Sequence, residues 1–169
     1  MASTYTDLGI ELMATGENAG TWGTKTNNNL NLIEQLTGGF ATLSIAGGAG
    51  TQALDIDDGA LTGTAQQRVI EFTGSISGNR IVTIPNDVET FYILKNSTTG
   101  ANTVQFKYAT GSGSSTTFSA TDKGTKIVYA SASPDATNPI IVDVMANSSE
   151  IALTNSNPIK FQDADNSAF

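Results

Sequence analysis

Short runs of β-branched and aromatic residues, separated by clusters of Gly, Asn and Asp, fill most of the chain after Phe40. Runs of this length between turn-forming residues are typical of β-strands. Val104, Phe106 and Tyr108 alternate with a Gln and a Lys, which predicts one buried face and one face in water. The pattern predicts an all-β module, and we expect an antiparallel β-sandwich or a jelly roll.

Eight segments carry this pattern. We predict strands at residues 41–46, 53–56, 68–74, 80–84, 90–96, 103–108, 125–130 and 139–145. The Ser-Gly-Asn sequence at residues 77–79 predicts a hairpin turn, and residues 99–102 predict a longer hairpin loop, because Gly and Asn accept positive φ at little cost.

One helix is predicted, near the N-terminus. Leu30, Ile33 and Leu36 recur at a spacing of three, and the Gly-Gly pair that follows is a helix stop signal. The three asparagines before Leu30 have poor helix propensity, so the helix would be marginal by itself. We therefore expect the apolar side formed by these three residues and Trp22 to pack against another chain.

These patterns divide the chain into three parts. Residues 1–39 form an N-terminal attachment segment with the helix, residues 40–146 form the β module, and residues 147–169 form a connector into a further segment. The connector begins a new strand pattern and then stops at Phe169, so we expect the natural chain to continue.

The chain contains no Cys and no His. This composition argues against disulfides, zinc fingers, Cys nucleophiles and imidazole acid–base chemistry, and we expect neither an enzyme nor a cofactor. The formal charge of −8 argues against nucleic-acid binding, which depends on clustered Lys and Arg. We also expect no membrane insertion, because no apolar run is long enough to span a bilayer, and synthesis in a cytoplasm, because the N-terminus lacks a signal-peptide pattern.

Several polar or Gly-rich motifs have both a functional and a loop interpretation. Asp55 and Asp57 would lie on one face of a strand with about 6.6 Å between their Cα atoms, a separation that suits a glycosidase carboxylate pair. Residues 163–168 (DADNSA) have the alternating oxygens of a calcium loop but lack its glycine. The segments 47–50 and 111–115 lack the Lys of a phosphate loop. We interpret all of them as loops and expect no metal site.

Three segments resemble tail-fibre and related virion proteins of marine bacteriophages. GENAGTWGTKTNNNLNLIEQ, at residues 16–35, is similar to the end that joins such a fibre to the particle. GSISGNRIVTIPNDVETFYILKNSTTGANTVQFK, at residues 74–107, and FSATDKGTKIVYA, at residues 118–130, together resemble a domain that recurs in these fibres. SNPIKFQDADNSAF, at residues 156–169, is similar to the opening of a repeated fibre segment.

The resemblance implies a structural virion protein, the proximal part of a homotrimeric tail fibre. The N-terminus would attach to tail or neck proteins, and the distal parts would contact a host surface receptor. The attachment or trimer interface would contain Trp22, Leu30, Ile33 and Leu36. The resemblance places the protein in the virion tail after assembly in the bacterial host cytoplasm.

Two other functions stay open. One is a carbohydrate-binding module or depolymerase of a tail spike, in which Phe91, Tyr92 and Tyr108 would stack on sugars and Asp55 with Asp57 would act on them. The other is a head fibre or capsid decoration protein, which would differ mainly in what the N-terminus contacts.

Overall fold

The computed structural model describes residues 2–121, 123–132 and 137–146, and the predicted connector and the calcium-like segment lie outside them. Strands far outnumber helices within these residues, so the chain is mostly β. β1 (Thr4–Tyr5) and β2 (Glu11–Leu12) pair antiparallel, and α1 (Trp22–Gly38) follows them. The later strands are β3 (Phe40–Ser44), β4 (Gly50–Ala53), β5 (Val69–Thr73), β6 (Arg80–Ile84), β7 (Glu89–Asn96), β8 (Val104–Tyr108), β9 (Thr116–Phe118), β10 (Thr125–Ser131) and β11 (Ile141–Asp143).

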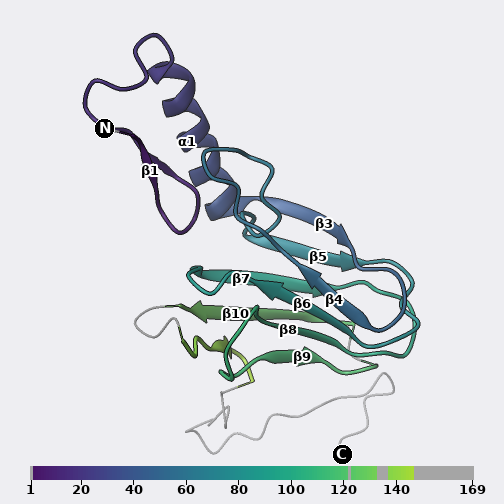
Figure 1. Cartoon of the computed structure of the whole chain (residues 1–169). Coiled ribbons are helices and arrows are strands. Elements are labelled where there is room, and N and C mark those ends of the chain that lie inside the picture. The colour runs from purple at the N-terminus through teal and green to yellow at the C-terminus, as the bar shows by residue number, and fades with distance from the viewer. Residues whose placement is uncertain (1, 122, 133–136, 147–169) are drawn as a thin grey trace, which may run out of the picture.

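The strands after α1 form two sheets. One sheet has the order β11-β10-β7-β5-β3, and the other has the order β4-β6-β8-β9. From β3 to β8 the chain alternates between the sheets, so β3 with β4, β5 with β6 and β7 with β8 each form one coil. Neighbouring coils pair in parallel, with Phe40 opposite Val69 and Val69 opposite Ile93. Figure 1 shows the coils stacked below α1, with β9 and β10 farther from the helix.

The prediction of an antiparallel module is wrong for these coils. The pairs β3/β5, β5/β7, β4/β6 and β6/β8 are parallel, whereas β7/β10, β10/β11 and β8/β9 are antiparallel. Residues 77–79 and 99–102 are therefore not hairpin turns, because each carries the chain from one sheet to the other. A jelly roll is built from antiparallel neighbours and does not fit these pairings.

The corners between the sheets stack as the strands do. Gly47 forms a parallel bridge with Ile76, and Ser75 forms one with Thr99. Gly100 has a positive φ of 98°, and a Cβ atom there would lie 2.1 Å from the carbonyl oxygen of Ile76. Since no side chain fits in that space, glycine allows the neighbouring corners to approach this closely.

The core lies between the two sheets. The prediction that Val104, Phe106 and Tyr108 form a buried face is confirmed. The ring of Phe106 packs against the rings of Phe72 and Tyr92 in the other sheet, with centroid separations of 6.5 Å and 5.6 Å. The sheets therefore share one apolar core.

Each of the eight predicted strand segments overlaps a strand of the structure. The segment 80–84 coincides with β6, whereas the segment 53–56 meets β4 only at Ala53. The strands β1, β2 and β9 were missed because two or three residues are too few for an alternating pattern to show.

Candidate attachment surface on the N-terminal helix

α1 connects the N-terminal hairpin to the β module. Its first turn has no side-chain cap, and the backbone N–H of Trp22 donates to the carbonyl oxygen of Asn18 at 2.8 Å. The helix ends at Gly38, as the Gly-Gly pair predicts. A Cβ atom at Gly39 would lie 2.6 Å from the backbone carbonyl oxygen of Gln35, so the chain can pass into β3 here only without a side chain.

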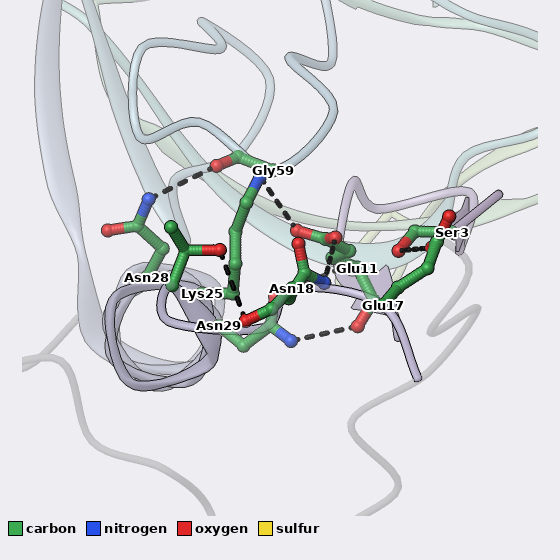
Figure 2. A network of polar contacts seen from close by, with 9 residues as sticks. Ser3, Glu11, Glu17, Asn18, Lys25, Asn28, Asn29 and Gly59 are labelled. Atoms are coloured by element: carbon green, nitrogen blue, oxygen red, sulfur yellow. Dashed lines mark hydrogen bonds and ion pairs between the residues drawn. The ribbon is translucent and has the colours of Figure 1, made fainter. Parts of the chain in front are cut away.

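Polar contacts fix one face of α1 to the N-terminal hairpin (Figure 2). The Asn29 side chain accepts from the backbone N–H of Glu11 at 2.9 Å and donates to its carbonyl oxygen at 2.8 Å. One carboxylate oxygen of Glu11 lies 3.0 Å from the ammonium of Lys25, and the other accepts from Asn18 at 3.1 Å. The hydrogen-bonded ion pair lowers the pKa of Glu11 and raises the pKa of Lys25.

The segment between β4 and β5 braces α1 as well. Asn28 donates to the carbonyl oxygen of Gly59 at 3.4 Å, and Gln35 donates to that of Leu61 at 3.3 Å. Leu32 is fully buried. Two of the three consecutive asparagines thus make contacts outside the helix, which stabilise it despite their low propensity.

The four predicted interface residues of α1 differ in burial. Trp22, Leu30 and Ile33 are 65%, 59% and 45% exposed, and we call them the exposed stripe. Leu36 is only 8% exposed. At about 100° per residue, Trp22, Ile33 and Leu30 span about 80° of the helix, and Leu36 lies about 40° beyond Trp22 on the side of Leu32. The expectation that nothing within the chain buries this helix is therefore wrong for Leu36.

Asp55 and Asp57 accept hydrogen bonds from threonines farther along the segment between β4 and β5. Asp55 accepts from the backbone N–H of Thr64 at 3.0 Å and from its hydroxyl, and Asp57 accepts from the hydroxyl of Thr62. The hydrogen bonds from Thr64 lower the pKa of Asp55, whereas a glycosidase general acid needs a raised pKa. These contacts favour the loop interpretation.

Two of the three aromatic residues considered for sugar stacking lie in the core. Tyr92 and Tyr108 are 1% and 2% exposed, and their hydroxyls donate to the carbonyl oxygens of Ala65 and Val88 at 2.8 Å and 2.7 Å. Burial raises the pKa of both phenols. Phe91 is accessible, with 51% of its surface exposed.

Comparisons with protein-family models, with curated proteins and with solved structures find no match. In the part of the chain that the structure describes, no three His, Cys, Asp or Glu side chains are grouped so that they could hold a metal ion. Among the same residues, no helix has the length and apolar character needed to cross a membrane. The functional interpretation therefore depends on the exposed stripe and on the coils.

Proposed function

We propose that this chain is a structural virion protein, the proximal part of a bacteriophage tail fibre. The observation that carries the proposal is the exposed stripe of Trp22, Leu30 and Ile33 on a helix whose other face is fixed to its own chain. Because the helix is braced, its apolar residues are held in position before any partner binds, which lowers the entropic cost of docking. The resemblance of residues 16–35 to fibre attachment ends supports the same role.

The three parts of the chain have separate roles in this proposal. Residues 1–39 attach to a tail or neck protein, and residues 40–146 form a rigid spacer of two facing sheets. Residues 147–169 lead to distal parts that contact the host receptor. Hydrogen bonding between coils and the shared core support the spacer role, because both oppose bending of the module.

The alternative functions have weaker support. A sugar-stacking surface would have to use Phe91 without Tyr92 and Tyr108, and Phe91 instead packs on Tyr129 with 5.0 Å between ring centroids. A depolymerase would need a protonated carboxyl group, whereas the pKa of Asp55 is lowered. A head fibre or decoration protein would use the same exposed stripe on a different partner.

The test is the location of this chain in particles of the phage that encodes it. An antibody against residues 40–146 is expected to label the tail or neck in electron micrographs. Label on the capsid would instead favour the head-fibre alternative. Peptide mass spectrometry that finds no trace of the chain in purified particles would overturn the proposal.

A matched pair of variants tests the exposed stripe itself. Leu30→Asp places a charge within the stripe and is expected to reduce incorporation into particles at least tenfold. Asn31→Asp adds the same charge at an exposed position outside the stripe and should leave incorporation unchanged. Equal incorporation of the two variants would remove the stripe from the attachment role.

A further inference from the structure

We propose that copies of this chain pack on one another through the outer face of the five-stranded sheet. An apolar row crosses this face from one edge to the other. The row consists of residues that lie opposite one another on successive strands, namely Phe40, Val69, Ile93, Ile127 and Val144. Val144 directly follows β11, and its N–H donates to the carbonyl oxygen of Ile127 at 2.9 Å.

The apolar row points away from the core. Ile70 and Leu94, which follow two of its members in sequence, are fully buried, and side chains along a strand alternate between faces. Phe40, Ile127 and Val144 are 58%, 40% and 42% exposed. Large apolar side chains are therefore accessible on the first, fourth and fifth strands of the row.

A second apolar group lies beside the row. Tyr129 is opposite Phe91 on one side and Val142 on the other, and the rings of Phe91 and Tyr129 are in contact. Together the two groups form a continuous apolar patch that extends over the whole width of the sheet. Contiguous exposed patches of this kind mark interaction surfaces in proteins that fold in water.

The outer face of the four-stranded sheet provides an internal comparison. Its central row crosses all four strands and contains Thr51, Ile81, Gln105 and Thr117, of which only one is apolar. If both outer faces were in contact with water, both should be polar. The contrast between two sheets of the same module indicates that the apolar face is covered.

The distribution of charge makes this face the one at which two copies can meet. The chain carries a formal charge of −8, so two copies repel each other over most of their surfaces. No member of the apolar row is charged, and at its border Glu71 and Lys95 cancel each other in an ion pair of 2.8 Å. Contact at this face therefore brings few like charges together.

The size of the patch fits a contact between proteins better than a small-ligand site. Each of the two half-exposed Phe rings contributes about 100 Å², and with the aliphatic residues the patch reaches roughly 500 Å². A standard interface buries about 800 Å² on each partner and consists of an apolar centre with a polar rim. The patch has the area of such a centre.

This inference deepens the proposed function and rests on it only for the number of copies, which a fibre would set at three. The test is sedimentation of the full chain over a range of concentrations. The wild-type chain is expected to have a multiple of the 17.5 kDa chain mass, and Ile127→Asp should reduce it to that of one chain. Ile81→Asp places the same charge on an inner strand of the other sheet and should keep the wild-type mass.

A second measurement identifies what covers the face. Because the chain has no Cys, Ile127→Cys carries a single thiol that can be labelled with a maleimide. Labelling should slow at least tenfold as the protein concentration rises, because association covers the thiol. The matched variant Ile81→Cys should label at one rate throughout.

Three results would overturn the inference. The first is a wild-type chain that stays monomeric at every concentration. The second is an Ile127→Asp variant that keeps the wild-type mass while Leu30→Asp dissociates, because the copies would then meet through α1. The third is slow labelling of Ile127→Cys at every concentration, because residues of the same chain would then cover the face. Absence of the chain from phage particles would refute the fibre role and leave this surface unaffected.

Discussion

Replacing Gly100 with Ala is expected to lower the free energy of unfolding by about 2–4 kcal/mol. The positive φ of 98° alone costs an L-residue about 1–2 kcal/mol. The new Cβ atom would also lie 2.1 Å from the carbonyl oxygen of Ile76, a backbone atom that cannot rotate away. The two corners must then separate, which weakens the 3.0 Å hydrogen bond from Asn102 to the same oxygen, worth about 1 kcal/mol.

Urea unfolding followed by circular dichroism measures this loss. At a slope of about 1–3 kcal/mol per molar urea, the midpoint should fall by about 0.7–4 M. All samples need the same protein concentration, because self-association would add to the apparent stability. The control is Gly48→Ala, since Gly48 has no positive φ and its added Cβ atom would meet nothing within 4 Å.

Gly48→Ala should keep the wild-type midpoint or raise it slightly, because Ala restricts the unfolded chain more than Gly does. A midpoint for Gly100→Ala equal to that of the wild type would refute the close stacking of corners. A fall for Gly48→Ala as large as that for Gly100→Ala would refute it too, since the effect would then not depend on the contact with Ile76.

Three further predictions concern the N-terminal segment. Leu32→Ala removes a fully buried side chain and should lower the unfolding free energy by about 2–4 kcal/mol in urea titrations, and a loss below about 1 kcal/mol would contradict its packing. Trp22→Ala should change that free energy by less than about 0.5 kcal/mol, because the ring is 65% exposed, and a larger loss would mean that the ring packs within its own chain. Acid should release the hairpin from α1. The pKa of Glu11 is lowered in the folded chain, so its ion pair with Lys25 contributes its full stabilisation above the ordinary pKa of 4.5. This stabilisation is lost as the pH falls through the lower pKa of the folded state. Hydrogen exchange in residues 2–20, corrected for its intrinsic pH dependence, should therefore rise in acid in the wild-type chain more than in Glu11→Gln, and identical profiles would exclude the ion pair as the cause.

Strand positions could be predicted from the sequence, whereas strand partners could not. Residues 80–84 coincide with β6 because a short continuous run of β-branched residues marks a strand locally. Residues 77–79 contain the same Ser-Gly-Asn signal whether the chain folds back within a sheet or crosses to another. The outcome depends on contacts such as that of Phe72 with Phe106, which join distant segments.

The helix shows the same division between local and distant information. Its end was predicted because a Gly-Gly stop signal is local. Leu32 was missed, although Lys25, Asn29, Leu32 and Leu36 recur at spacings of four, three and four. Half of these residues are polar, so the four do not form an apolar pattern. Lys25 and Asn29 both contact Glu11, which lies in another segment, and local sequence does not predict such contacts.

The chain enters the β module at β3 and leaves the described part of it at β11, and these are the two outer strands of one sheet. In the proposed fibre, a pulling force between the attached N-terminal segment and the distal parts would therefore cross the strand junctions of that sheet in series. β10 and β11 share three opposed residue pairs, whereas β7 and β10 share seven. Under such tension β11 should detach first while the coils from β3 to β8 stay paired, so mechanical failure would begin at the C-terminal side of the module.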